Sequence, residues 1–168
     1  VRGGQHGLKV ANDEGKSLKQ IHFKVPSSLR SLEFVLAQLE HCYDPRIGVR
    51  DWSQCRLLLA EGFTNTVRHA HRQLPEATEI ELEMTLFPQS LRLRIWDQGP
   101  GFDLLGYCQQ KPGATSELPE GGWGLNILVT LADSLSYDQP EPGRNCLVIT
   151  KTFAIPLLDF PEDDLKMG

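Results

Sequence analysis

One segment of the sequence repeats polar side chains at intervals of four residues. Glu61, Asn65 and His69 follow one another at this spacing inside a run that favours a helix. Each four-residue step along an α-helix turns the side chain by about 40° and advances it by about 6 Å, so a carboxylate, an amide and an imidazole lie along one stripe. Such a stripe is typical of a solvated helix face. Because Leu57–Ala60 and Phe63 surround Glu61 with apolar neighbours, it is also a candidate for a less exposed polar binding site.

The carboxylate of Asp97 is a second candidate. It continues the alternating apolar series that ends at Ile95 by one more step of two, so it points to the buried side of a strand. A buried ionised carboxylate is costly unless hydrogen-bond donors face it. Asp97 therefore either caps the turn 98–101 or accepts a hydrogen bond from an exocyclic amine of a bound ligand. In the second case Gly99 and Gly101 would let the backbone approach a flat ring closely.

Clustered glycines stand directly before a predicted helix, in the segment 121–125 with the sequence Gly-Gly-Trp-Gly-Leu. Free backbone N–H groups and the positive end of a helix dipole suit phosphate oxygens there. The segment is not a Walker loop, since no Gly-Lys-Ser/Thr follows, and it lacks the GxGxxG of a dinucleotide fold. The preceding polar residues 102–121 are either a lid that closes over a ligand or an ordinary flexible loop.

These groups need a scaffold, which hydrophobic periodicity predicts. The predicted strands are Ile21–Val25, Glu79–Leu86, Leu91–Trp96, Leu135–Tyr137 and Cys146–Phe153, and the predicted helices are Leu29–Leu39, Trp52–His71 and Trp123–Ala132. Asp51 and Gln54 are typical of a capping pair that opens the second helix. The strands 79–86 and 91–96 form a hairpin in which glutamates and arginines are expected to pair across the wet face. Strands interleaved with helices predict an antiparallel or mixed sheet with helices on one face.

The composition limits the class of protein in which these groups act. The chain has 168 residues, of which 40% are hydrophobic and 23% are charged, and this predicts one folded domain. A formal net charge of −5 argues against a direct nucleic-acid partner, and no apolar run is long enough to predict a membrane span. The four cysteines form no CxxC pair, which favours a reducing, cytoplasmic setting. We expect a flexible arm over residues 1–20, the folded domain over 21–153 and an acidic tail over 154–168.

Taken in chain order, these features resemble the GHKL superfamily of ATP-binding domains, which includes gyrase, histidine kinases and heat-shock chaperones. Glu61-xxx-Asn65-xxx-His69 is similar to its N box, the segment 97–101 to its G1 box and the segment 122–125 to its G2 box. The resemblance covers roughly residues 20–153 and is strongest with the compact bacterial anti-sigma-factor serine kinases. It implies an α/β two-layer sandwich of the GHKL (Bergerat) type, with a mixed sheet and helices on one face.

The resemblance also implies a role for each matching residue. Glu61 is similar to the general base that takes a proton from the attacking hydroxyl, Asn65 to the Mg²⁺ ligand, and His69 to a residue near the phosphates. Asp97 resembles the anchor that accepts from the N6 amine of adenine. Backbone contacts to the base and the phosphates are implied for Gly99, Gly101, Gly122, Gly124 and Leu125. A metal shared by His69 and His71 is not expected, because alternate residues on a helix point about 200° apart.

By the same resemblance, the chain is expected to be an ATP- and Mg²⁺-dependent serine/threonine protein kinase that is also an anti-sigma factor. Its protein substrate would be a STAS-type anti-anti-sigma antagonist, its second partner a sigma factor, and the chain itself a homodimer. One position departs from the sporulation-type members: Glu120 stands where they carry an arginine that reaches the γ-phosphate. The alternative is therefore a nucleotide-dependent partner-switching module with little or no kinase activity. A detached catalytic domain of a histidine kinase is a third interpretation, which the short lid disfavours.

Overall fold

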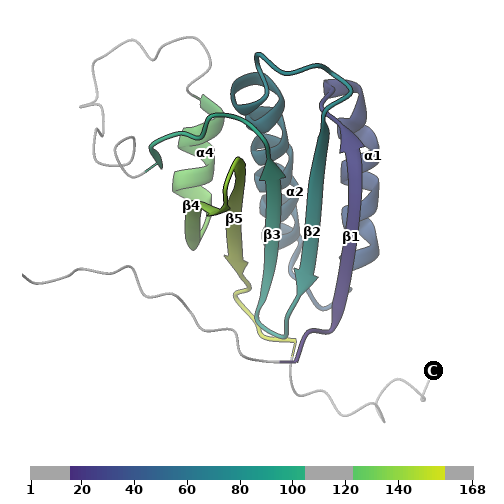
Figure 1. Cartoon of the computed structure of the whole chain (residues 1–168). Helices are drawn as coiled ribbons and strands as arrows, with labels where there is room; N and C mark the ends of the chain where they lie inside the picture. Colours follow the sequence, from purple (N-terminus) through teal and green to yellow (C-terminus); the bar gives the residue numbers. More distant parts are fainter. Residues whose placement is uncertain (1–15, 105–122, 158–168) are drawn as a thin grey trace, which may run out of the picture.

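The computed structural model describes residues 16–104 and 123–157 (Figure 1). Residues 1–15 of the expected arm, residues 158–168 of the expected tail and most of the expected lid lie outside these ranges. In chain order the elements are β1 (Lys19–Pro26), the 3-10 turn η1 (Leu29–Ser31), α1 (Leu32–Leu39), the 3-10 turn η2 (Glu40–Cys42), α2 (Val49–Asn65), the π-helical turn η3 (Thr66–Ala70), β2 (Glu79–Leu86), β3 (Ser90–Asp97), α4 (Trp123–Leu131), β4 (Ser134–Glu141) and β5 (Arg144–Thr152). Among the described residues no helix is long and apolar enough to cross a membrane.

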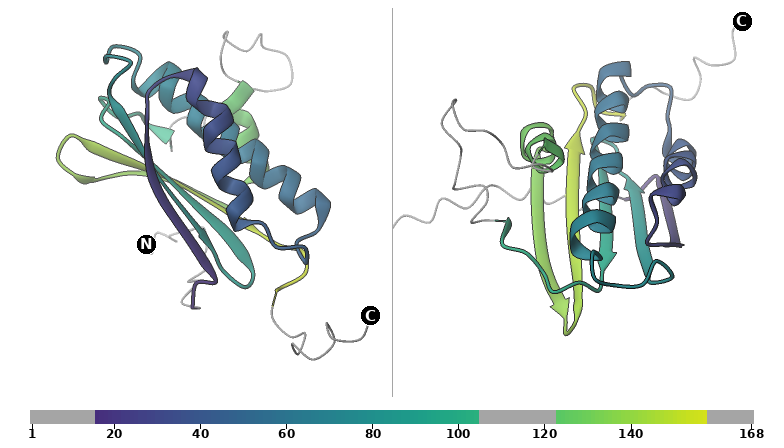
Figure 2. Two further views of the ribbon diagram at one scale, coloured as in Figure 1. Left: turned by 90° about the vertical axis from the view of Figure 1, so that its right-hand side faces the viewer. Right: turned by 90° about the horizontal axis from the view of Figure 1, so that it is seen from above.

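The strands form one sheet in the order β1-β2-β3-β5-β4, and α1, α2 and α4 cover one face of it (Figure 2). The expected α/β sandwich is therefore confirmed. The sheet is purely antiparallel rather than mixed, because every neighbouring pair runs in opposite directions. Two helices connect β1 to β2, so the chain returns to the end of the sheet that it left and β2 runs back along β1. Among the described residues, α4 stands between β3 and β4 in the chain. These two strands run in the same direction, and β5 lies between them in the sheet.

Because apolar and polar residues alternate along β2 and β3, the face of the sheet under the helices is apolar and the open face is polar. Leu82 on β2 is paired with Ile95 on β3, and both are fully buried beneath the helices. The next residue along β2, Glu83, is paired with Arg94, and the two side chains form an ion pair of 3.5 Å on the open face. The expected pairing of glutamates with arginines across the hairpin is thus confirmed at this position.

Helix α2 packs against the middle of the sheet at Gly62. A Cβ atom at this position would meet Cδ1 of Ile95 at 2.8 Å and Cδ1 of Ile149 at 3.0 Å. Both isoleucines are fully buried, and a close-packed interior leaves them little room to move. Because Gly62 has no side chain, α2 can approach β3 and β5 closely. This close approach also sets the distance between the sheet and the helix backbone that carries Glu61.

Both the start of α2 and the end of the domain differ from the expectation. The helix begins at Val49 and Asp51 does not cap it; the Asp51 carboxylate instead accepts the backbone N–H of Ala154 at 2.8 Å. Slightly further along, Leu157 is 3% exposed and belongs to the hydrophobic core. The chain therefore packs against the domain beyond Phe153, where the sequence suggested that the folded part ends.

The close approach at Gly62 makes Gly62→Ala a test of the packing between α2 and the sheet. Helix propensity alone favours alanine by about 1 kcal/mol, whereas overpacking a filled core costs about 1–3 kcal/mol. Because two strands contact the same point, we expect overpacking to prevail and the free energy of unfolding in urea to fall by about 1 kcal/mol. Ser53→Ala, exposed on the same helix, is the control and should be neutral or slightly stabilising. A Gly62→Ala chain that is more stable than the native one would show that the isoleucines yield.

Candidate functional site

The end of β3 places the carboxylate of Asp97 in the interior, where it is 2% exposed. Its Oδ1 accepts from the Gly99 N–H at 2.8 Å and from Nδ2 of Asn145 at 2.9 Å, and its Oδ2 accepts from the Tyr137 hydroxyl at 2.8 Å. Burial raises the pKa of Tyr137 well above its ordinary value and the Asp97 carboxylate raises it further, so the phenol stays a donor. Asp97 thus caps the turn that follows it. It also keeps acceptor capacity on Oδ2, because a carboxylate has about four acceptor positions.

The turn after Asp97 lies against the end of the helical segment η3. A Cβ atom at Gly99 would overlap the backbone carbonyl of Ala70, so this position has room for glycine alone. Gly101 has a φ of +84°, a conformation that glycine adopts without steric cost. The turn therefore requires both glycines for its own geometry, and their contacts with a ligand stay a prediction.

The start of α4 brings Gly124 against the polar residues of α2. A Cβ atom at Gly124 would overlap Oε2 of Glu61 and would lie 3.2 Å from Oδ1 of Asn65. The structure therefore brings together the predicted N and G2 boxes, which are far apart in the sequence. Glu61 and Asn65 are both partly exposed, and their oxygens are the hard donors that Mg²⁺ prefers, so this pair fits the ion that the resemblance implies.

His69 does not continue the stripe of Glu61 and Asn65 in the expected way. After Asn65 the chain forms the π-helical turn η3, in which the His71 N–H donates to the carbonyl of Thr66, five residues earlier, at 2.9 Å. This turn is wider than an α-helical turn, so a step of four residues no longer advances the side chain by the same angle. The straight stripe therefore ends at Asn65. His69 is exposed, and its role near phosphates stays a prediction.

The contacts of the described residues do not test the predicted roles of Leu125, Gly122 and Glu120. Leu125 is partly buried and packs against the hydrophobic core. Gly122 and Glu120 lie outside the described residues, as does most of the expected lid. The roles of Leu125 and Gly122 and the effect of Glu120 therefore stay predictions.

His71, which sequence reasoning set aside, connects η3 to the turn after β3. Its ring is 3% exposed, and Nε2 accepts the N–H of Gln98 at 2.9 Å. An Nε2 that accepts a backbone N–H carries no proton, so the neutral ring has its proton on Nδ1. Burial lowers the pKa of His71 from its ordinary value of 6.5, and the Asp97 carboxylate opposes this shift. Of His69 and His71, it is therefore the buried His71 that contacts the turn after Asp97, through the N–H of Gln98.

Two further site residues, Tyr137 and Asn145, were missed although the alternation of their strands could have found them. Asn145 stands two residues before Leu147 on β5, just as Asp97 stands two residues after an inward apolar residue on β3. The register confirms this symmetry, because Asp97 and Asn145 are direct partners across the two strands. Tyr137 occupies the inward position of β4 opposite Leu147. Polar residues at inward strand positions were the available signal.

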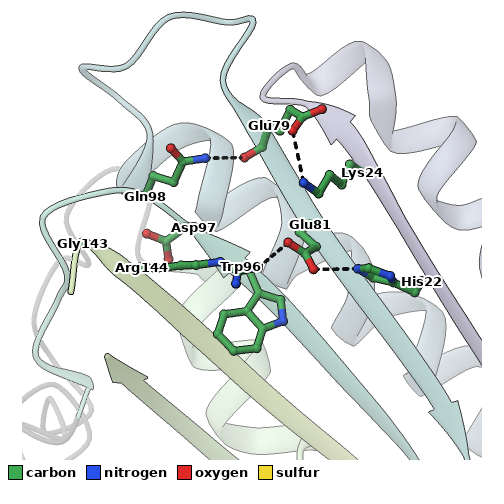
Figure 3. A pocket seen from close by; sticks show the side chains of 9 residues that line it. All are labelled: His22, Lys24, Glu79, Glu81, Trp96, Asp97, Gln98, Gly143 and Arg144. Carbon is green, nitrogen blue, oxygen red and sulfur yellow. Dashed lines mark hydrogen bonds and ion pairs between the residues drawn. The ribbon is translucent and has the colours of Figure 1, made fainter. Parts of the chain in front are cut away.

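A hollow of about 460 Å³, which Asp97 and Gln98 line at the end of β3, opens on the uncovered face of the sheet (Figure 3). The Arg144 guanidinium pairs with Glu81 and stacks over the Trp96 ring at 4.3 Å, and His22 hydrogen-bonds Glu81 at 2.6 Å. Lys24 in turn pairs with Glu79. Because these charged groups pair with one another, we place the candidate site on the helix-covered side, at Asp97, Glu61 and Asn65.

Comparisons with known proteins bear on the family of the chain. Residues 25–151 match the family model described as the histidine kinase-like ATPase domain. Curated relatives are named serine-protein kinase RsbW: the protein of Bacillus licheniformis is 27% identical over 111 residues, which are 62% of this chain and 65% of the relative. That of Listeria innocua is 33% identical over 91 residues, which are 50% of this chain and 57% of the relative. That of Staphylococcus epidermidis is 27% identical over 124 residues, which are 69% of this chain and 77% of the relative.

The lengths of these matches limit what they show. The chain spans less than two thirds of the Bacillus licheniformis and Listeria innocua relatives, at 65% and 57% of their lengths. Among solved structures, the RsbU and RsbW domains of Rv1364c from Mycobacterium tuberculosis match with a TM-score of 0.56 and 14% sequence identity. That match covers 84% of this chain and 35% of the other. It supports the fold.

The buried neutral His71 makes stability depend on pH. Because its folded pKa is lowered, the unfolded chain binds a proton more readily, and stability is fully present above the ordinary pKa of 6.5 and declines as the pH falls below it. We expect the free energy of unfolding in urea to fall between about pH 7 and about pH 5, and to fall less in His71→Gln. His41→Gln, at an exposed position, is the control and should keep the native slope. Equal slopes in all three chains would contradict the role of His71.

Proposed function

This chain belongs to the family of histidine kinase-like ATPase domains, and from that we propose that it is an ATP- and Mg²⁺-dependent serine/threonine protein kinase. In the same proposal it is an anti-sigma factor that phosphorylates a STAS-type anti-anti-sigma antagonist, sequesters a sigma factor and acts as a homodimer in the cytoplasm. The relatives named serine-protein kinase support the class of reaction. The antagonist and the sigma factor rest on the resemblance carried by the N, G1 and G2 boxes.

The observation that carries the proposal is the contact of Gly124 with Glu61 and Asn65. Gly124 lies in the first turn of α4, where backbone N–H groups and the helix dipole favour phosphate oxygens. A phosphate bound there lies beside a carboxylate and an amide oxygen at once. The proximity of an acceptor for a proton, a ligand for Mg²⁺ and a phosphate site supports phosphoryl transfer, which depends mostly on positioning and charge neutralisation.

Each of these side chains has a distinct part in the proposed reaction. Asp97 accepts from the N6 amine and fixes the base, while Asn65 contributes its oxygen to Mg²⁺, which neutralises phosphate charge when bound. Glu61 takes the proton of the substrate hydroxyl as that oxygen bonds to the γ-phosphorus and the bond to the β-phosphate oxygen breaks. The products are the phosphorylated antagonist and ADP, and the proton stays on Glu61 until water removes it.

The experiment that tests the proposal is transfer of label from γ-labelled ATP, with Mg²⁺, to a candidate STAS-type antagonist. Label on a serine or threonine of the antagonist supports the kinase. Tight ATP binding without transfer to any antagonist supports the partner-switching module instead, and Glu120→Arg then tests whether its charge prevents transfer.

Asp97→Asn tests the anchoring of the base. The amide presents an N–H₂ group where Oδ2 accepted a hydrogen bond, so a donor faces the N6 amine. Leaving a buried polar group unpaired costs about 1–3 kcal/mol, and we expect ATP affinity by calorimetry to fall on the order of ten- to a hundredfold. Asp138→Asn, exposed on β4, is the control. Unchanged ATP affinity in Asp97→Asn would exclude the role of Asp97 in binding adenine.

Glu61→Gln separates binding from chemistry. Glutamine keeps the size of the side chain but removes the basic oxygen, so we expect ATP affinity within a few-fold of native and phosphotransfer lower by about 10²–10⁴. Asn65→Ala should in addition weaken the Mg²⁺ dependence of nucleotide binding. Glu33→Gln, exposed on α1, is the control. A Glu61→Gln chain that phosphorylates the antagonist at the native rate would show that another group takes the proton.

A further inference from the structure

The two oxygens of Asp97 differ in the acceptor capacity that they have left. Oδ1 accepts from the Gly99 N–H at 2.8 Å and from Nδ2 of Asn145 at 2.9 Å. A carboxylate has about two acceptor positions on each oxygen, so Oδ1 is full. Among the described residues, Oδ2 accepts from the Tyr137 hydroxyl at 2.8 Å and from no other donor, so it keeps one position. Asp97 can take one further N–H, on Oδ2 alone.

The amide of Asn145 is fixed in the orientation that fills Oδ1. Asn145 is 2% exposed and pairs directly with Asp97 across β3 and β5. Its Nδ2 donates both to Asp97 and, at 3.0 Å, to the carbonyl of Gly99. Both neighbours are acceptors, so a flipped amide would set its oxygen against two other oxygens. The donor therefore stays on the side of Asp97.

We propose that Asn145 determines the base selectivity of this site by closing Oδ1 of Asp97 to the ligand. The inference rests on the proposed function, in which Asp97 anchors a purine. The 6-amine of adenine needs one acceptor, and Oδ2 supplies it. Guanine offers two adjacent donors, N1–H and the 2-amine, which match a carboxylate only when both of its oxygens are open. Asn145 thus admits 6-aminopurine nucleotides and excludes the two-point contact with guanine.

The test compares the dissociation constants of ATP and GTP for the native chain and its variants. Asn145→Leu keeps the branched shape without the donor, and Asn145→Ala removes the side chain. In both we expect the preference for ATP over GTP to fall about five- to tenfold, the effect of one hydrogen bond. Tyr137→Phe is the matched control: it removes a donor from the other oxygen, so ATP affinity changes while the preference stays within about twofold. A merely structural defect would weaken both nucleotides alike.

The outcomes separate this inference from the proposed function. An unchanged preference in the Asn145 variants would overturn the inference while ATP binding stands, and so would a native chain that binds GTP as tightly as ATP. A native chain that binds neither nucleotide would overturn the proposed function and the inference together. Thermal unfolding of each variant shows that it is folded. Asn145→Leu, which fills the same space, carries the test if Asn145→Ala does not fold.

Discussion

A charged carboxylate held almost entirely out of water is the constraint on which this structure depends. Asp97 is stable in the interior because donors reach it, and within the described part of the chain they come from the turn that follows it, from β4 and from β5. Tyr137 and Asn145 can be delivered only if β5 lies next to β3 and β4 lies beyond it. Asp97 thus links three features of the fold: the order of the strands, the inward orientation of the polar strand residues and the conformation of the turn.

Much of the fold could be predicted from the sequence because the signals are local. The alternation over residues 79–86 and 91–96 predicts both strands and the face that each residue takes, and the pair of Glu83 with Arg94 follows from it. The choice between an antiparallel and a mixed sheet could not be made in the same way. It depends on β5 entering between β3 and β4, which is a contact between distant parts of the chain. The position of Asp51 also depends on such a contact, because its partner Ala154 lies at the far end of the domain.

The same distinction between local signals and contacts of distant residues applies to the candidate site. Glu61 and Asn65 share a helix face by spacing alone, and Asp97 points inward by strand parity, so all three were predicted. Their approach to Gly124 could not be derived from spacing, since it depends on how α4 packs against α2. The position of His71 depends on the π-helical turn, which hydrophobic periodicity does not predict. One widened turn changes the direction in which the following side chains point.

The arrangement of β3, β5 and Asp97 also fixes when the site can exist during synthesis. Tyr137 follows Asp97 by 40 residues and Asn145 follows it by 48 residues. At about 5–20 residues per second, several seconds of translation separate the carboxylate from its partners. During that interval β3 has an unpaired edge and Asp97 stays hydrated, because burial without donors is too costly. The helix that carries Glu61 is made early, but Asp97 can be buried with its donors only when the hairpin of β4 and β5 has left the ribosome.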